Sequence, residues 1–351
     1  MSESKLKTAV LGLDSKGLLL LEAALKTDYF AIAAVADKDT KLAERTALKY
    51  NCTGYDDYRR LIIQNQFDCL LVAGAIHTCD EYVKMAVKKK TNILKLAPLA
   101  RNFQEAVELA RLADDENVKF AVANPGRFAG SFLALRDFLQ QNQNEQFFFT
   151  TAFCSAGSEG IGDWQTDPKL AGGGVLLHNC YEIIDQIVWN LATPEMVYCL
   201  NTNTAGDRQQ RSYLTEDTAV VTMKFTDSFF GNLTASSKVF GKEQKILKLY
   251  GKDKILTASN AQFVISDGAE QTSEKSEYDD DEFARHTALL KNFALSILSP
   301  DNNKLCSSAR ENLNNMAVIE AAYLSARTGM PEEPGKILKM AHAEPANIRL
   351  T

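Results

Sequence analysis

The chain has 351 residues, of which 45% are hydrophobic and 24% are charged, and its formal net charge is -6. This balance is typical of a globular protein, and the negative charge disfavours a surface for nucleic acid or anionic membrane. The length predicts two domains rather than one core. The seven cysteines include no Cys-x-x-Cys pair, and the first residues do not resemble a signal peptide. We therefore expect a cytoplasmic protein with reduced thiols and with small-molecule or protein partners.

The first elements follow a strand, turn, helix, strand order. An apolar strand is expected at residues 7–11, a helix at 18–25 and a second strand at 31–36, which leads directly into Asp37. A nucleotide-binding βαβ unit has this layout, with phosphate at the helix N-terminus and an acid that binds the ribose hydroxyls.

The turn of this unit carries an incomplete glycine signature. Gly12 and Gly17 occupy the outer glycine positions, and Asp37 lies twenty residues beyond Gly17. Asp14 stands at the middle position, where the backbone must approach the pyrophosphate, so its negative charge would lie beside phosphate. We place all four residues at a cofactor site that is altered or unused, and a plain strand-to-helix turn remains the alternative.

Helices and strands continue to alternate up to residue 123. The expected helices are 41–50, 80–89 and 102–115, and the expected strands are 69–73, 92–96 and 118–123. This alternation predicts a doubly wound parallel sheet, whose ligands bind beyond the carboxyl ends of the strands. Pro98 should therefore rim the same crevice as Asp37. The Asp37 carboxylate favours NAD by repelling a 2′-phosphate, although Lys38 beside it weakens that preference.

The pattern changes at residue 124, so we expect domains at 1–123 and 124–351. The second domain is predicted to be α+β with a large, mostly antiparallel sheet. Its expected strands are 146–153, 218–225, 230–236, 245–250 and 262–266, and helices follow near 283–298 and 307–328. The acidic segment 274–282 is interpreted as a solvated approach to the first of these helices.

A loop of three glycines, Gly172 to Gly174, precedes a largely buried helix at residues 175–189. His178 and Glu182 are four residues apart and would share one helix face, which Asp185 continues one turn later. The pair is a candidate acid and base lining a pocket. An ordinary i,i+4 contact at the start of a helix is the alternative.

With both halves considered, the chain resembles the glucose-fructose oxidoreductase, inositol dehydrogenase and MocA family of nicotinamide-dependent oxidoreductases. The similar segments are residues 10–17, Asp37, 93–100, 127–128, 164–168, 172–185 and 321–329. The resemblance implies a Rossmann domain followed by an open-faced sheet domain, with bound NAD or NADP, NAD being slightly favoured. It also implies a sugar or cyclitol substrate and a homo-dimer or homo-tetramer.

The resemblance also shows that the residues which perform the family's chemistry are replaced. Ala97 stands in the place of the family's lysine, and His178 and Glu182 stand where an aspartate and a histidine are usual. Hydride transfer needs a base near the carbinol oxygen and a positive charge for the developing alkoxide, and Ala97 supplies neither. The first hypothesis is thus a non-catalytic, degenerate binder of a nucleotide-like or sugar-like ligand.

Two other hypotheses remain. An active NAD(P)-dependent oxidoreductase would use His178 as base, oriented by Glu182, while Lys95 reaches the place of Ala97. A zinc site would use the pairs His77-x-Cys79 and His178-x-Cys180, whose spacing differs from that of known zinc sites. We therefore expect no metal.

Three further residues are candidates for substrate contacts. Arg127 has the charge to hold a hydroxyl or a carboxylate, with a salt bridge as the alternative. Trp164 offers an aromatic face to the apolar side of a sugar ring. Asp185 matches the last acid of the family's motif and would either contact a substrate hydroxyl or cap neighbouring backbone.

Overall fold

The computed structural model describes residues 5–156, 163–205, 214–239, 241–267 and 272–342. The chain divides into two compact units. Unit 1 comprises residues 1–101, 108–130 and 278–312, and unit 2 comprises 102–107, 131–277 and 313–351. Relative to a division at residue 123, unit 1 gains a helix from late in the chain, which packs against the first helix of the unit. A local change of pattern does not reveal such a long-range contact.

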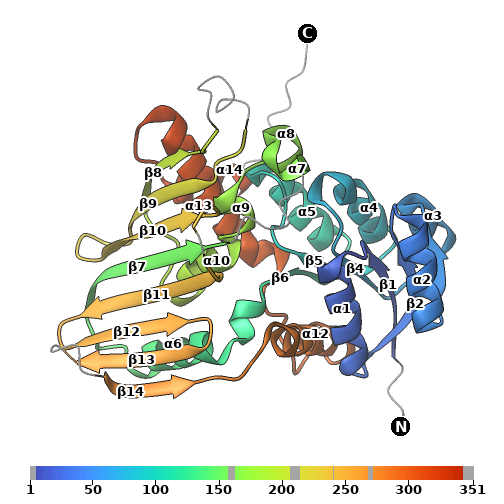
Figure 1. Cartoon of the computed structure of the whole chain (residues 1–351), viewed down its shortest axis with the longest axis horizontal. Helices are drawn as coiled ribbons and strands as arrows, with labels where there is room; N and C mark the ends of the chain where they lie inside the picture. Colours follow the sequence, from blue (N-terminus) through green and yellow to red (C-terminus); the bar gives the residue numbers. More distant parts are fainter. Residues whose placement is uncertain (1–4, 157–162, 206–213, 240, 268–271, 343–351) are drawn as a thin grey trace. The chain divides into compact units, whose positions relative to one another are not determined.

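A six-stranded parallel sheet forms the centre of unit 1, in the order β3-β2-β1-β4-β5-β6 (Figure 1). The strands are β1 (Leu6–Leu11), β2 (Phe30–Ala36), β3 (Thr53–Tyr55), β4 (Cys69–Val72), β5 (Asn92–Leu96) and β6 (Phe120–Ala123). The predicted doubly wound sheet is confirmed. The strand order reverses between β1 and β4, and a crevice beyond the carboxyl ends of these two strands is where such sheets bind ligands.

Aspartate side chains cap several helices of unit 1. The side chains of Asp14, Asp39, Asp57 and Asp281 each accept a hydrogen bond from an N–H of the helix that follows. The helices are α1 (Ser15–Lys26), α2 (Thr40–Tyr50), α3 (Tyr58–Gln64), α4 (Ile76–Lys88), the 3-10 helix η1 (Pro125–Phe128) and α12 (Glu282–Leu298); α5 (Phe103–Asp115) begins in unit 2 and ends in unit 1. Their apolar faces bury a core against the sheet.

Unit 2 contains an eight-stranded sheet in the order β14-β13-β12-β11-β7-β10-β9-β8. The strands are β7 (Phe147–Ser155), β8 (Met196–Thr202), β9 (Thr218–Lys224), β10 (Phe230–Ser236), β11 (Gln244–Gly251), β12 (Lys254–Ser259), β13 (Gln262–Asp267) and β14 (Thr272–Glu277). All neighbours are antiparallel except β7 and β10, so the mostly antiparallel prediction is confirmed.

The prediction for residues 274–282 was wrong in part. Residues 272–277 form β14, which pairs with β13 through backbone hydrogen bonds at the edge of the sheet. An edge strand presents one side to solvent and tolerates charged side chains, so its sequence shows little apolar alternation.

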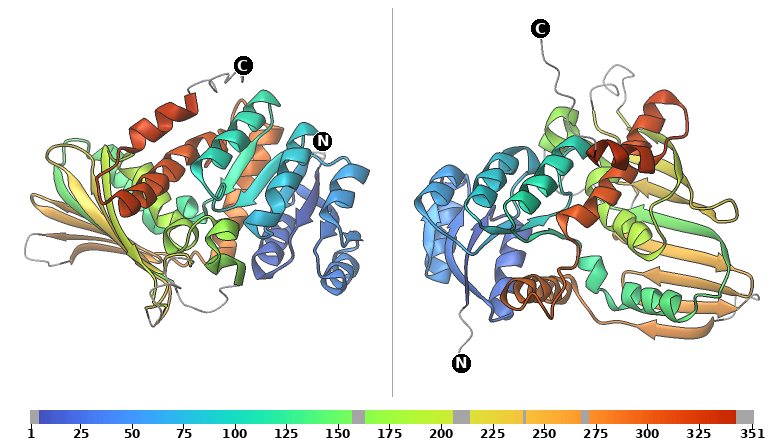
Figure 2. Two further views of the ribbon diagram at one scale, coloured as in Figure 1. Left: turned by 90° about the horizontal axis from the view of Figure 1, so that it is seen from above. Right: turned by 180° about the vertical axis from the view of Figure 1, so that it is seen from behind.

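Helices of unit 2 cover one face of this sheet, and no described helix of that unit lies on the other face (Figure 2). The helices are α6 (Gly130–Gln141), α7 (Asp163–Thr166), α8 (Pro168–Ala171), α9 (Val175–His178), α10 (Tyr181–Asn190), α13 (Ala309–Thr328) and α14 (Pro334–His342); the first residues of α6 and α13 belong to unit 1. The single helix expected at 175–189 is interrupted at Asn179 and Cys180. Within the described ranges, no helix has both the length and the apolar character needed to cross a membrane.

Candidate functional site

The glycine turn of unit 1 is sterically specified. Gly12 has a φ of +89°, and a Cβ there would lie 2.3 Å from the Gly74 nitrogen. A Cβ on Gly17 would lie 2.0 Å from the Gly12 carbonyl oxygen. The first glycine therefore permits the tight turn and the last one permits close packing of α1 on the strands, as in dinucleotide-binding turns.

Asp14 occupies the end of α1 that faces a phosphate in such turns. It is the N-cap residue, and its Oδ1 accepts a hydrogen bond of 2.9 Å from the Gly17 N–H. The side chain is exposed. The carboxylate thus satisfies a helix N–H group and places a negative charge where the helix dipole favours an anion.

Asp37 follows β2 and supports the glycine turn. Its Oδ2 accepts from the Leu13 N–H at 2.7 Å, and its Oδ1 accepts from the Asp39 N–H at 2.9 Å. A carboxylate has further acceptor positions, so Asp37 can still accept hydroxyl hydrogens. Gly12, Gly17 and Asp37 therefore have the turn geometry and the carboxylate position of a dinucleotide-binding turn, whereas Asp14 adds a negative charge at the N-terminus of α1.

The buried side chain of Tyr58, which was not predicted as a site residue, lies beside Gly74. Its hydroxyl lies 3.6 Å from the position that a Cβ on Gly74 would take. Burial raises the pKa of Tyr58, and the nearby Asp37 carboxylate raises it further, so the phenol keeps its proton at neutral pH. Asp57 is the feature of the sequence that could have indicated this helix, because its side chain caps α3 and makes Tyr58 the first helical residue.

Lys95 is held by a buried ion pair and by a backbone carbonyl oxygen. Its Nζ lies 2.6 Å from Asp80 Oδ1 and donates to the Leu99 carbonyl oxygen at 2.9 Å, and its side chain is 3% exposed. Ala97 carries a methyl group, and Pro98 after it is buried. The segment after β5 therefore has no charged side chain at the position of the family's lysine.

The two histidine-x-cysteine pairs consist of partly buried histidines and buried cysteines. Burial lowers the pKa of His77, and Lys38 and Arg101 lower it further. Burial raises the pKa of Cys79 to about 11 and the pKa of Cys180 well above its ordinary value. In the part of the chain that the structure describes, no three His, Cys, Asp or Glu residues are grouped to hold a metal ion.

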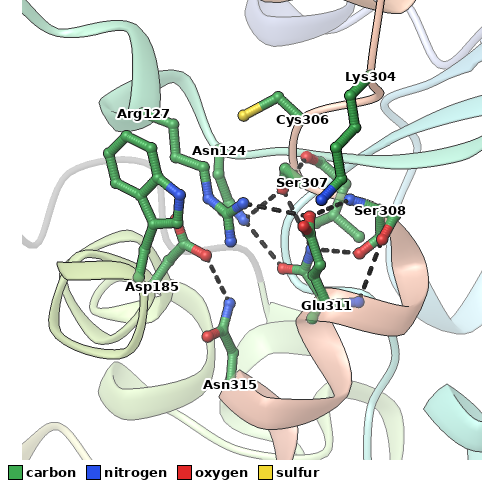
Figure 3. Close-up of polar contacts among 12 residues, drawn as sticks. Asn124, Arg127, Asp185, Lys304, Cys306, Ser307, Ser308, Glu311 and Asn315 are labelled. Carbon is green, nitrogen blue, oxygen red and sulfur yellow. Dashed lines mark hydrogen bonds and ion pairs between the residues drawn. The ribbon is translucent and has the colours of Figure 1, made fainter. Parts of the chain in front are cut away.

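Arg127 lies in a polar cluster of unit 1 (Figure 3). Its side chain is 4% exposed, and its Nη1 lies 3.3 Å from Glu311 Oε2. Asn124, on the same segment, donates to Ser307 Oγ and Asn312 Oδ1, both at 2.9 Å. These contacts tie the end of β6 to the start of α13, which corresponds to the salt-bridge alternative for Arg127.

In unit 2, the glycine loop is held by a partly buried carboxylate, Glu216, which was not predicted from the sequence. Glu216 Oε2 accepts from the Gly174 N–H at 2.8 Å, and Oε1 accepts from the Leu176 N–H at 3.0 Å and the Tyr323 hydroxyl at 2.8 Å. Burial raises the pKa of Glu216, and these hydrogen bonds act in the opposite direction. A Cβ on Gly174 would lie 1.8 Å from the Glu216 carbonyl oxygen, and one on Gly173 would lie 2.1 Å from the Tyr323 hydroxyl.

His178 lines a cavity of about 390 Å³ within unit 2. The other lining residues are Gln165, Thr166, Gly174, Val175, Asn179, Asn203, Thr204, Ala205, Leu214, Thr215, Glu216, Asp217, Ser237 and Lys238. His178 Nε2 lies 3.1 Å from the Ala171 carbonyl oxygen, which can only accept, so Nε2 carries hydrogen in this arrangement. Trp164 meets the imidazole edge-on, with ring centroids 5.6 Å apart.

Glu182 and Asp185 have partners outside this cavity. Glu182 forms an ion pair with Lys245 on β11, and Lys245 also lies 2.8 Å from Glu243. Burial lowers the pKa of Lys245, but the two carboxylates more than offset this and the net pKa is raised. His178 and Glu182 lie on two helices, α9 and α10, rather than on one predicted helix face.

Asp185 is completely buried and accepts a hydrogen bond of 2.7 Å from Asn315 Nδ2 (Figure 3). This geometry corresponds to a role in packing α10 against α13. A direct contact with ligand would require the side chain to leave this environment.

Comparison with known families decides the ancestry of the chain. Residues 6–124 match the family model described as the NAD-binding Rossmann fold of an oxidoreductase family, and residues 139–333 match the C-terminal alpha/beta domain of that family. The chain belongs to the Gfo/Idh/MocA family. The resemblance inferred from the sequence is therefore confirmed, and unit 1 contains the family's NAD-binding Rossmann domain.

Individual members of the Gfo/Idh/MocA family are distant in sequence. D-xylose 1-dehydrogenase (NADP(+)) 2 of Haloferax volcanii is 24% identical over 196 residues, which span 56% of this chain and 60% of that protein. A levoglucosan dehydrogenase solved with NADH and levoglucosan has a TM-score of 0.85 at 13% identity, covering 94% of this chain and 99% of that one. An Agrobacterium radiobacter oxidoreductase solved with NAD+, L-tartaric acid and magnesium has a TM-score of 0.82 at 16% identity, covering 95% and 100%. These structures share the fold.

Proposed function

We propose that this chain is a non-catalytic member of the Gfo/Idh/MocA family that binds a sugar-like ligand in the cavity of unit 2. The cavity supports a hydroxyl-rich ligand because hydroxyl, amide and carboxylate side chains such as Thr166, Asn203, Thr204 and Asp217 line it. Trp164, beside the His178 ring, has the aromatic surface that suits the apolar side of a sugar ring.

The observation that carries the proposal is the state of Lys95. Ala97 cannot supply the family's positive charge, and Lys95 is buried against Asp80 and the Leu99 carbonyl oxygen. An alkoxide that develops during hydride transfer would lack a lysine to stabilise it. The engagement of Glu182 by Lys245 further supports a structural role at the position of the family's histidine.

The test measures ligand binding and hydride transfer separately on the purified chain. A panel of aldoses, polyols, cyclitols and sugar acids is screened by calorimetry, and each sugar is also assayed for NAD(P)H absorbance change with both cofactors. We expect binding of at least one sugar without turnover, and loss of that binding in Thr204→Val. Turnover with any sugar in the panel would refute the non-catalytic proposal.

A second candidate is an active NAD(P)-dependent oxidoreductase with His178 as base, and the position of His178 in the cavity favours it. With Nε2 bound to the Ala171 carbonyl oxygen, Nδ1 is the basic nitrogen of the neutral ring. This candidate predicts turnover that His178→Ala abolishes. NAD and NADP are both compatible with it.

The uncovered face of the eight-stranded sheet supports self-association. Its register places five large exposed side chains on that face, namely Met196, Tyr198, Leu200, Val220 and Phe230. An exposed apolar patch of this kind is typical of a protein interface. We expect a homo-dimer or homo-tetramer by light scattering, and a smaller species for Leu200→Lys; Leu48→Lys, at a more exposed leucine of unit 1, is the control. Equal mass for all three proteins would contradict this.

A further inference from the structure

We propose that Asp14 is a built-in substitute for the dinucleotide pyrophosphate, so that the crevice of unit 1 disfavours phosphate at this position. The inference concerns affinity in unit 1 and holds whether or not the chain transfers hydride. The proposal is based on a difference between the two glycines of one turn and the aspartate between them. Gly12 and Gly17 keep the backbone shape of a phosphate-binding turn, whereas the residue between them carries a carboxylate on the helix end.

Two features indicate that the Asp14 carboxylate occupies the place of a bound phosphate at the N-terminus of α1. Its Oδ1 accepts the Gly17 N–H at 2.9 Å, so a donor at the N-terminus of the twelve-residue helix α1 already has a partner. Its charge lies where the helix macrodipole is most favourable to negative charge. A pyrophosphate arriving there would have to displace the carboxylate or accept its repulsion.

The remaining crevice is suited to a neutral ribosyl group. The Asp37 oxygens each accept one backbone N–H, which fixes the carboxylate and leaves acceptor positions for hydroxyl donors. A nucleoside without phosphate meets this carboxylate and avoids Asp14.

The test compares the calorimetric affinities of NADH and adenosine for the wild-type chain, Asp14→Gly and Asp14→Asn. We expect Asp14→Gly to raise the affinity for NADH at least tenfold, which corresponds to about 1.4 kcal/mol. The affinity for adenosine should stay within about twofold. Asp14→Asn removes the charge but retains a side-chain oxygen as cap, so it should recover part of the gain.

Asp281→Gly is the matched control. Asp281 is also an aspartate N-cap in unit 1, and its Oδ1 accepts from the Ala284 N–H at 2.7 Å with the same spacing of three residues. Its replacement removes a cap of the same kind from α12, so it reports the general effect of a lost cap. We expect it to leave the NADH affinity unchanged.

Salt supplies a readout that a purely structural role would not move. Raising the ionic strength from about 0.1 M to about 1 M shortens the screening length from about 10 Å to about 3 Å. The ratio of the two NADH affinities, Asp14→Gly over wild type, should therefore shrink. Equal NADH affinity in the two proteins, including no binding to either, would overturn the proposal, and so would an equal gain for adenosine.

Discussion

Asp80→Ala is expected to lower the free energy of unfolding by about 3 kcal/mol or more, because it leaves the Lys95 ammonium group buried without its carboxylate. The Lys95 side chain is 3% exposed and the Asp80 side chain 16% exposed, with 2.6 Å between Nζ and Oδ1. The Leu99 carbonyl oxygen remains as an acceptor, but a neutral dipole does not replace a charge. Urea unfolding followed by circular dichroism measures the change.

Two comparisons isolate the buried ion pair. Asp115→Ala removes one partner of an exposed ion pair, in which the Asp115 side chain is 66% exposed and the Arg111 side chain 68% exposed. This change should lower the free energy of unfolding by no more than about 1 kcal/mol. Lys95→Met combined with Asp80→Leu replaces both charges by apolar groups and should recover most of the lost stability. If Asp80→Ala unfolds at the same urea concentration as Asp115→Ala, Lys95 is not locked in the ion pair, and the support for a non-catalytic function is lost.

The fold followed from the sequence because both sheets leave periodic signals. Buried parallel strands read as apolar runs, as in residues 69–72, and the strands of the second sheet alternate between apolar and polar side chains. The polar edge strand β14 and the short helix α3 carry little periodicity and were missed. The packing of α12 on α1 depends on contacts between residues far apart in the sequence.

The candidate site was predicted less completely, since side-chain partners come from distant segments. The sequence places His178 and Glu182 four residues apart, but it does not reveal that the helix is interrupted between them or that Lys245 binds Glu182. Glu216 lies in a stretch without a motif. Its role emerges from the folded chain, where it contacts both Gly174 and Tyr323.

Gly174→Ala is expected to lower the free energy of unfolding by about 3 kcal/mol or more and to abolish ligand binding in the cavity of unit 2. An added Cβ would lie 1.8 Å from the Glu216 carbonyl oxygen. That oxygen accepts the Val175 N–H at 2.9 Å, and the Glu216 carboxylate accepts the Gly174 N–H, so the backbone cannot withdraw without breaking hydrogen bonds.

The contact therefore links stability to the position of His178, which ends the short helix α9 that Gly174 caps. Gly335→Ala is the matched control because no atom within 4 Å opposes a Cβ there, and it should be neutral or slightly stabilising. Urea midpoints and sugar calorimetry are measured on both variants. Equal midpoints would show that the loop yields to a methyl group; a lower midpoint with unchanged sugar affinity would show instead that the loop contributes to stability but does not position the cavity.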